Sequence, residues 1–385
     1  MITADDFIDG ALGEGFDFYT GVPCSLLTPL INGVLSRRGL AYVGATSEGE
    51  AVAIAAGAWL AGRQSVVMCQ NSGLGNAVNP LTSLNAPFRI PTLFITTWRG
   101  EPGIPDEPQH ELMGQITHQL LALIGVESAA FPENSAALPG LLQQAARYMD
   151  ETALPFGLVM RKGAVADTEL RQTPLPVRPV GSLARLAESG RRPSRAEALQ
   201  RFLDLTDDET AVVATTGKTG RELFTLADRP QHIYQVGSMG GATGMALGVA
   251  LNSPHPVVVL DGDGAALMKL GTMATVGAYA PPNLTHILLD NGVHDSTGGQ
   301  ATVSASVDFA LVAHACGYRY TATADSLDGF ETALNDARRV QGPALIHLRI
   351  SPGSMAKLGR PTVSPAEVAQ RFKAFVTRPL AAPSS

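Results

Sequence analysis

Short apolar runs alternate with longer, mixed stretches along most of the chain. Runs such as Val257 to Leu260 and Thr285 to Leu289 are almost wholly apolar, which is typical of strands buried on both faces of a parallel sheet. The stretches between them are long enough for helices. This rhythm predicts an α/β protein built from doubly wound parallel sheets.

In the first part of the chain, helices are expected over residues 3–12, 51–61, 111–123 and 134–149, and strands over 16–20, 40–45, 65–69, 92–97 and 157–161. A further helix is expected to open near Asn79, after a loop rich in Gly, Asn and Ser. The proline-rich stretch 101–109 is too irregular for a helix or strand and long for a connector. Long ordered loops of this kind often act as lids.

Between residues 169 and 195, Pro, Gly and Arg occur without any period, which predicts a linker. The chain therefore divides into a domain over 1–168, a linker over 169–195, a second domain over 196–378 and a disordered tail over 379–385. In the second domain we expect strands over 210–214, 233–236, 257–260, 285–289 and 344–350. Helices are expected over 242–251, 265–279 and 305–315, with a last one from a capping box at Ser364.

The composition of the chain limits the kinds of molecule that the protein is expected to bind. The net charge of −7 argues against nucleic acid or an anionic membrane surface, so an anionic substrate would need a local basic pocket. No apolar run is long enough to span a bilayer, and the acidic start is unlike a signal peptide. Three scattered cysteines indicate neither a zinc site nor a disulfide framework. We expect a cytoplasmic protein.

The candidate chemistry is concentrated after two of the predicted strands. Gly262, Asp263 and Gly264 follow the first, and 25 residues (265–289) separate them from Asp290 and Asn291 after the second. Parallel strands end at the same sheet edge, so the Asp263 carboxylate and the Asn291 amide oxygen should lie together there. Such hard oxygen ligands suit Mg²⁺ or Ca²⁺, and Mg²⁺ usually bridges protein oxygens to phosphates. The alternative is a glycine-rich turn without a metal.

Three other positions carry weaker signals. Ser25 follows a strand and could face a ligand, although a serine in this position is more often a helix N-cap. Glu48 stands where a strand becomes a helix, where an acid also stabilises the helix dipole. The loop with Asn71 and Gly73 could hold a polar ligand through its backbone N–H groups. A dinucleotide-binding alternative rests on the 236–241 loop with Asp261, but its glycine spacing differs from GxGxxG.

The spacing of GDG and DN resembles the cofactor signature of thiamine-diphosphate enzymes, with Asp290 in place of the usual first asparagine. The resemblance implies two domains, one binding the pyrimidine and the other the diphosphate, with no middle domain. It implies that Glu48 hydrogen-bonds the pyrimidine ring and that Met239 wedges the cofactor into a bent shape. It also implies that Asp263, Asn291 and the Val293 carbonyl hold Mg²⁺. The implied cofactor contacts are Glu48, Asn71, Gly73, Thr216, Gly217, Gly237, Ser238, Met239, Gly262, Asp263, Gly264, Ala265 and Asn291.

Longer stretches of both domains are similar to the phosphonopyruvate decarboxylase family, among them YTGVPCSLL, TSEGEAVAIAAG, TTWRGEPGIPDEPQH and DNGVHDSTGGQATVS. Cys24 departs from the acidic residue expected in the first of them. The resemblance implies decarboxylation of 3-phosphonopyruvate to phosphonoacetaldehyde and CO₂ in phosphonate biosynthesis. It implies catalytic roles for Glu48, Ser25 and His294. The candidate substrate contacts are Ser25, Arg99, His110, Lys218, His294, Ser296 and Thr297.

Alternatives remain at this point. Sulfopyruvate decarboxylase, or another decarboxylase of small anionic 2-oxo acids, would share the mechanism, because a site for phosphonate would also hold sulfonate. An inactive, cofactor-binding subunit would keep the fold without the chemistry. The family's site lies between domains of different subunits, so the resemblance also implies a homo-oligomer with active sites at subunit interfaces.

Overall fold

The structure, a computed structural model, describes residues 1–188 and 190–380. The chain forms two compact units, Met1–Pro174 and Leu175–Ser385, and each is described by itself. Their boundary falls inside the predicted linker. The predicted disordered tail lies mostly outside the described residues, which end at Leu380.

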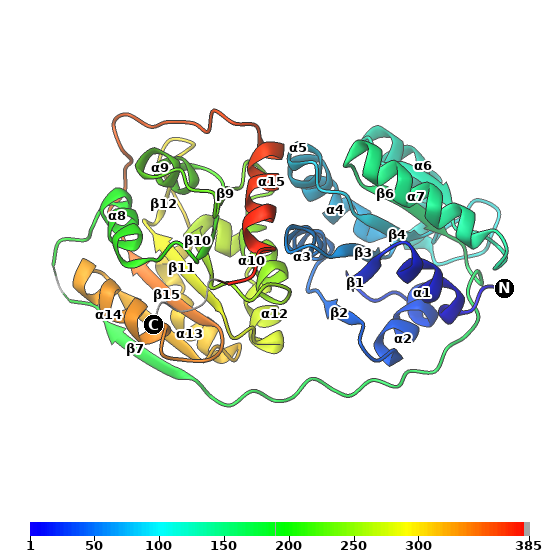
Figure 1. Cartoon of the computed structure of the whole chain (residues 1–385), viewed down its shortest axis with the longest axis horizontal. Coiled ribbons are helices and arrows are strands. Elements are labelled where there is room, and N and C mark those ends of the chain that lie inside the picture. The colour runs from blue at the N-terminus through cyan, green and yellow to red at the C-terminus, as the bar shows by residue number, and fades with distance from the viewer. Residues whose placement is uncertain (189, 381–385) are drawn as a thin grey trace. The chain divides into compact units, whose positions relative to one another are not determined.

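The described residues of the first unit form a six-stranded parallel sheet in the order β2-β1-β3-β4-β6-β5 (Figure 1). The strands are β1 (Phe16–Gly21), β2 (Ala41–Gly44), β3 (Gln64–Cys69), β4 (Leu93–Thr97), β5 (Glu127–Ala130) and β6 (Phe156–Met160). The helices are α1 (Ala4–Gly13), α2 (Thr28–Ser36), α3 (Glu48–Leu60), α4 (Leu74–Pro80), α5 (Ala86–Phe88), α6 (Glu111–Leu123) and α7 (Leu138–Thr152). Short turns of helix lie at Ser25–Leu27, Asn71–Gly73, Leu81–Asn85 and Pro108–His110.

Helices cover both faces of this sheet, which explains its apolar strands. Val66 and Met68 of β3 pack into a core with α1, α2 and α7, whereas Val67 and Cys69 pack into a second core with α3, α4 and α6. Successive strand residues point to opposite faces, so a strand covered on both sides is apolar along most of its length. Helix α3 is buried from Gly49 to Leu60.

Three details of the first unit differ from the sequence-based expectations. The helix expected near Asn79 begins at Leu74, directly after the turn Asn71–Gly73. Helix α7 begins at Leu138, four residues later than its predicted start at 134. Strand β5 was not predicted, because its residues are mostly small and only partly buried at the sheet edge.

The described residues of the second unit form a seven-stranded parallel sheet in the order β7-β14-β15-β11-β10-β8-β9. The strands are β7 (Ser182–Leu186), β8 (Ala211–Ala214), β9 (His232–Tyr234), β10 (Val257–Gly262), β11 (Leu284–Asp290), β14 (Tyr320–Ala324) and β15 (Ala344–Arg349), with a separate antiparallel pair, β12 (Val293–His294) and β13 (Gln300–Ala301). The helices are α8 (Arg195–Leu205), α9 (Lys218–Leu226), α10 (Ala242–Ala250), α11 (Asp263–Met268), α12 (Thr272–Tyr279), α13 (Phe309–Ala315), α14 (Leu327–Ala337) and α15 (Pro365–Val376).

Two predictions for this unit were wrong. The linker was expected to extend to residue 195, but Ser182–Leu186 pairs with β14 as an edge strand. An edge strand needs only one partner and one buried face, so its composition is hard to distinguish from that of a linker. The single helix expected over 265–279 is two helices, α11 and α12, because Lys269 leaves the helical conformation (φ −133°, ψ 44°).

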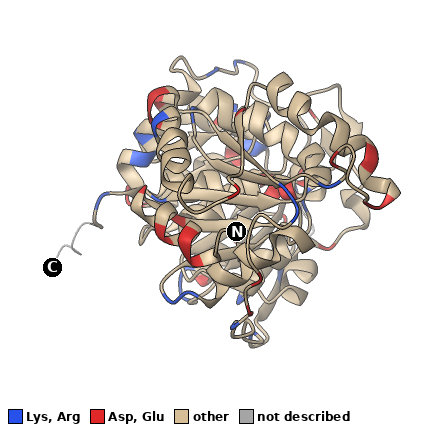
Figure 2. Cartoon of the chain, turned by 90° about the vertical axis from the view of Figure 1, so that its right-hand side faces the viewer, with Lys and Arg blue, Asp and Glu red and all other residues tan. Residues whose placement is uncertain are grey.

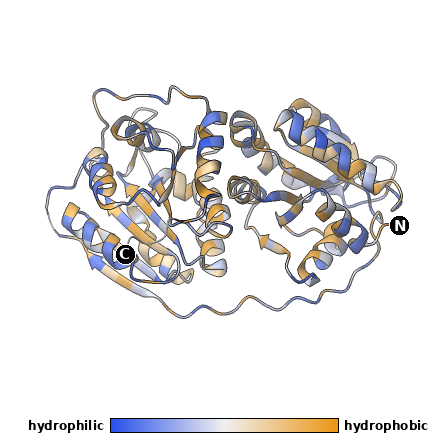
Figure 3. Ribbon diagram, in the orientation of Figure 1, coloured by the Kyte–Doolittle hydropathy of each residue, from blue (hydrophilic) through white to orange (hydrophobic). Residues whose placement is uncertain are grey.

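Hydropathy and charge follow this architecture. The sheet strands are predominantly apolar, whereas outer helices such as α6 and α7 alternate apolar and polar residues (Figure 3). On the face drawn in Figure 2, acidic and basic residues are interspersed over helices and loops. Among the described residues, no helix is both long and apolar enough to cross a membrane.

Candidate active site

Two polar strand ends lie side by side at one edge of the second sheet. Strands β10 and β11 are parallel neighbours, with Gly262 paired to Leu289. Asp263, the first residue of α11, and Asn291, just after β11, are both buried there. The structure therefore brings these two side chains to the same edge, as the sequence predicted. Their role as metal ligands stays a prediction.

The Asp263 carboxylate lies in a setting that favours a cation. Its Oδ2 accepts a hydrogen bond from Thr302 Oγ1. Burial, and more weakly the nearby carboxylate of Asp290, raise the pKa of Asp263. A divalent cation at this carboxylate would counter both effects, because it stabilises the ionised form.

Asp290 stands in place of the usual asparagine, and its side chain is buried inside the second unit. Its carboxylate accepts hydrogen bonds from His347 Nε2 at 2.8 Å, Ser304 Oγ at 2.9 Å and Gly292 N at 3.0 Å. Burial alone would raise the pKa of Asp290, but these hydrogen bonds, led by that of His347, lower it. Asp290 therefore secures the turn that presents Asn291.

Asn291 is oriented by its own loop. Its Nδ2 donates to Asp295 Oδ2 at 2.6 Å, and its Oδ1 accepts from Val293 N at 3.2 Å. Asp295 is bound to Arg195 at 2.7 Å. Asp295 thus has Asn291 and Arg195 as side-chain partners.

The glycine-rich loops meet over Gly264. A Cβ added there would lie 2.8 Å from His294 Cε1 and 3.3 Å from Met239 Cε, so only glycine leaves room for both side chains. Met239 follows Gly237 and Ser238, and Ser238 has the left-handed φ of 50°. This conformation is uncommon for a residue with a side chain and marks a tightly constrained loop.

These loops line one pocket of the second unit, together with the start of α9. Gly217 has a φ of 94°, and a Cβ on it would lie 3.2 Å from Ser296 Oγ. Lys218 is half-buried, and its side chain has no hydrogen bond or ion pair with any described residue. The other predicted site residues in the pocket lining are Thr216, Gly262, Ala265, Val293 and Thr297.

In the first unit, Glu48 is the first residue of α3, with Ser47 as the N-cap. Its Oε2 accepts a hydrogen bond from Asn76 Nδ2 at 2.9 Å. The carboxylate lies against Gly73, where an added Cβ would be 2.2 Å from Glu48 Oε1. Glu50, by contrast, is buried and accepts hydrogen bonds from Thr46 N and Oγ1. Glu48 is the partly exposed acid of the two, in keeping with its selection from the sequence.

Ser25 and Arg99 form a second polar group in this unit. Arg99 donates to Ser25 Oγ at 3.2 Å and to Asp106 Oδ2 at 2.7 Å. This guanidinium holds the pKa of Asp106 well below its usual range. Ser25 does not cap a helix, since the turn Ser25–Leu27 has Cys24 at its N-cap position. His110 ends the 101–109 loop and is buried, and its Nδ1 has no hydrogen-bond partner among the described residues.

Asn71 is fully buried. Its Nδ2 donates to Arg99 O at 2.8 Å and to Thr117 Oγ1 at 2.9 Å. Its side-chain donors are thus used within the first unit, and a cofactor contact from Asn71 stays a prediction.

The donor set fits Mg²⁺ with a diphosphate better than a protein-only metal centre. Among the described residues, no group of three or more His, Cys, Asp or Glu side chains could hold a metal ion. Asp263, Asn291 and the Val293 carbonyl supply a few hard oxygens beside a pocket that also contains Lys218. Mg²⁺ characteristically combines a few protein oxygens with waters and phosphate oxygens.

Several residues that support this site were not found from the sequence. They are Thr302, which contacts Asp263, and Arg195 and Glu222, which are linked to Asn291 through Asp295. Arg195 had been assigned to the end of the linker. The only local signal at this point is the Ser194–Glu197 capping box, which marks the start of α8.

Comparisons with known proteins agree with this geometry. Residues 1–121 match the family described as "Thiamine pyrophosphate enzyme, N-terminal TPP binding domain", and residues 215–348 match the corresponding "C-terminal TPP binding domain". A 4-hydroxybenzoylformate decarboxylase of Rhodococcus jostii, described as thiamine diphosphate-dependent, shares the fold with a TM-score of 0.71 at 14% identity. That comparison covers 92% of this chain and 100% of the other.

Relatives at higher identity cover nearly the whole chain. The phosphonopyruvate decarboxylase of Streptomyces viridochromogenes is 53% identical over 98% of this chain and 96% of the relative. That of Streptomyces hygroscopicus is 52% identical over 98% and 95%. The sulfopyruvate decarboxylase of Methanosarcina acetivorans is 30% identical over 93% and 94%. The chain therefore belongs to the phosphonopyruvate decarboxylase family of thiamine pyrophosphate enzymes.

Proposed function

We propose that this protein catalyses the decarboxylation of 3-phosphonopyruvate to phosphonoacetaldehyde and CO₂, with thiamine diphosphate and Mg²⁺. The observation that carries the proposal is the 53% identity to a phosphonopyruvate decarboxylase over 98% of the chain. The arrangement of the Met239, Asp263 and His294 loops around one pocket supports it. The reaction is that of a carbon–carbon lyase in phosphonate biosynthesis.

Each unit contributes its own residues to this activity. Thiamine diphosphate, when bound, supplies the electron sink that a 2-oxo acid needs to lose CO₂. Glu48 would hydrogen-bond the pyrimidine ring, for which its partly exposed position at the start of α3 is suited. In the second unit, Asp263, Asn291 and the Val293 carbonyl would hold Mg²⁺, and Met239 would set the shape of the cofactor.

The substrate's phosphonate needs cationic or hydrogen-bonding groups in an acidic protein. Lys218 supplies an ammonium in the pocket without a partner among the described residues. His294, Ser296 and Thr297 line the same pocket and offer donors. We assign the phosphonate to this group, and the substrate carboxylate to Ser25 with Arg99 nearby. His110 is retained as a candidate.

The direct test measures CO₂ release from phosphonopyruvate and from sulfopyruvate, each with thiamine diphosphate and Mg²⁺. We expect turnover of phosphonopyruvate that falls about 10²–10⁴-fold in a Glu48→Gln variant, the usual loss for an acid–base element. Cofactor binding without CO₂ release would refute the proposal and favour an inactive, cofactor-binding subunit.

Sulfopyruvate decarboxylation is the second candidate, supported by the relative at 30% identity. A higher kcat/KM for sulfopyruvate than for phosphonopyruvate would favour it. We further propose a homo-oligomer with active sites at subunit interfaces. A cytoplasmic location stays a prediction.

A further inference from the structure

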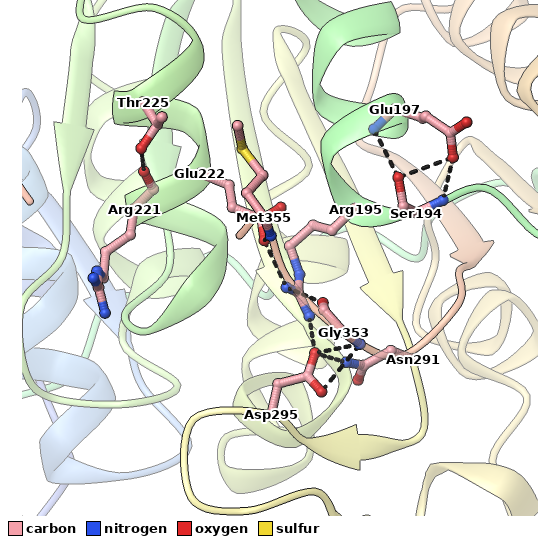
Figure 4. Close-up of polar contacts among 10 residues, drawn as sticks. All are labelled: Ser194, Arg195, Glu197, Arg221, Glu222, Thr225, Asn291, Asp295, Gly353 and Met355. Carbon is pink, nitrogen blue, oxygen red and sulfur yellow. Dashed lines mark hydrogen bonds and ion pairs between the residues drawn. The ribbon is translucent and has the colours of Figure 1, made fainter. Parts of the chain in front are cut away.

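A buried arginine lies beside the candidate metal site. Arg195, the first residue of α8, is buried and binds two carboxylates (Figure 4). Its Nη2 lies 2.7 Å from Asp295 Oδ2, and its Nη1 lies 3.3 Å from Glu222 Oε1. The guanidinium therefore connects α8 and α9 with the loop that follows β11.

The segment after β15 completes this network. Arg195 Nη1 donates to Gly353 O at 3.1 Å, and Gly353 N donates to both Asp295 oxygens at 3.2 Å. Met355 N donates to Glu222 Oε1 at 3.1 Å. Four segments that are distant in sequence thus converge on one charged cluster (Figure 4).

A buried cluster of charged side chains rarely adds to the folding stability of a protein. Removing three charged groups from water is costly, and apolar side chains of similar volume are often as stable. Glu222 Oε2 is moreover buried without a hydrogen-bond partner among the described residues.

The outer end of the network is the Asn291 amide. Asp295 is an acceptor only, so it selects the Nδ2 end of the amide, at 2.6 Å. The Oδ1 end must then face away from Asp295. An unsupported asparagine could rotate and present its NH₂ group instead, which cannot bind a cation.

We propose that Arg195, together with Glu222 and Asp295, acts as a positioning group that fixes Asn291 with its oxygen toward Mg²⁺. The inference rests on the proposed function only in that Mg²⁺ and thiamine diphosphate bind in this pocket. It adds three residues that act through Asn291, and two of them, Arg195 and Asp295, also line the pocket.

The test is calorimetric titration of Mg²⁺ into protein saturated with thiamine diphosphate, which reports binding without turnover. We expect Arg195→Met to weaken Mg²⁺ binding about 10–100-fold, as for other residues that orient metal ligands. Asp295→Leu has a similar volume but no acceptor for Asn291 Nδ2, and it should weaken binding in the same range, so the test holds if Arg195→Met does not fold. Arg195→Lys should recover part of the loss, because an ammonium can still reach one carboxylate.

Arg221 provides the matched control. It donates to Gly359 O at 3.0 Å and Leu358 O at 3.1 Å, and so secures the same segment after β15 without contacting Asp295 or Glu222. Figure 4 shows it at a separate position from the Arg195 cluster. We expect Arg221→Met to bind Mg²⁺ like the wild type.

The outcomes separate the two proposals. If the wild type binds Mg²⁺ and Asp295→Leu binds it equally tightly, the positioning role is wrong. The same holds if Arg221→Met weakens binding as much as Arg195→Met, since the effect would then be general loosening of the segment. If the wild type itself binds neither Mg²⁺ nor thiamine diphosphate, the proposed function fails and the inference fails with it.

Discussion

At the residue scale, Gly73 leaves room for the carboxylate of Glu48. Glu48 begins α3 and Gly73 ends the turn Asn71–Gly73, and the Glu48 carboxylate fills the space where a Cβ of residue 73 would be. Gly73 has an ordinary φ of −73°, so glycine is not required there by backbone conformation. The requirement is space for the carboxylate.

We therefore predict that Gly73→Ala displaces Glu48 while leaving the fold intact. The new Cβ would lie 2.2 Å from Glu48 Oε1, and the carboxylate, as the end of a flexible side chain, would move. We expect kcat to fall at least about tenfold, toward the loss for Glu48→Gln. Steady-state kinetics with a thermal melt would measure both effects.

Gly75→Ala is the control for this substitution. Nothing lies within 4 Å of a Cβ at Gly75, which is exposed in helix α4. It should keep full activity and gain slightly in stability, since alanine is the better helix former. Equal activity of the Gly73→Ala and Gly75→Ala variants would show that Glu48 does not need its present position.

A buried histidine makes the second unit sensitive to acid. Burial lowers the pKa of His232 to about 4, although Nδ1 donates to Ala227 O. The unfolded chain titrates near 6.5. Between these two pH values, His232 is protonated in the unfolded chain but not in the folded one. The free energy of unfolding therefore keeps its full value above about pH 6.5 and falls as the pH drops toward 4.

We predict that His232→Gln flattens this dependence. From pH 7 to pH 4.5, the free energy of unfolding should fall by about 2 kcal/mol more in the wild type than in the variant. The difference arises because the unfolded chain binds one more proton, which is worth about 1.4 kcal/mol per pH unit. Urea unfolding of both proteins at each pH measures this difference in the free energy of unfolding. Above pH 7 the two proteins should respond to pH alike, and a parallel loss at low pH would exclude His232 as the cause.

At the element scale, two ion pairs hold the 101–109 loop, Glu101 with Arg161 at its start and Asp106 with Arg99 further along. Asp106 accepts from Arg99 Nε at 2.7 Å, from Gly100 N at 2.8 Å and from Glu107 N at 2.8 Å. Residues 102–109 are exposed. A loop anchored at its base and free at its tip is suited to the lid predicted from its sequence.

Asp106→Asn should loosen this loop, because the amide loses the charge that binds Arg99. We expect amide hydrogen exchange in residues 100–109 to become several-fold faster, with the sheet unchanged. Glu107→Gln is the matched control, since the Glu107 side chain has no hydrogen bond or ion pair with a described residue. Unchanged exchange in Asp106→Asn would show that other contacts hold the loop.

At the scale of the whole molecule, Glu48 and Asp263 belong to different compact units. If each site joins these units from two subunits, two inactive variants should complement each other. Glu48→Gln mixed with Asp263→Asn under subunit exchange would generate some wholly wild-type sites. For a randomly mixed dimer we expect about a quarter of wild-type activity. Absence of recovery, with exchange verified by mass, would place both residues of a site in one chain.

The local signals in the sequence were sufficient for many of the helices and strands and for the outline of the site. The capping boxes at Thr3 and Ser364, the apolar strands and the Gly262–Gly264 turn each reflect short-range preferences that survive in the fold. The juxtaposition of Asp263 and Asn291 followed from a general rule, because parallel neighbours end at the same edge.

Only the tertiary structure decided the features that depend on pairing across the chain. Strand β7 is recognised through its partner β14, not through its own composition. The bond between Arg195 and Asp295 spans 100 residues, and neither residue carries a local sign of the other. The space that Gly73 leaves for the Glu48 carboxylate likewise depends on how the start of α3 packs against the turn Asn71–Gly73. Chemistry that resides in one segment can be read from sequence, whereas the groups that orient it are specified only by packing.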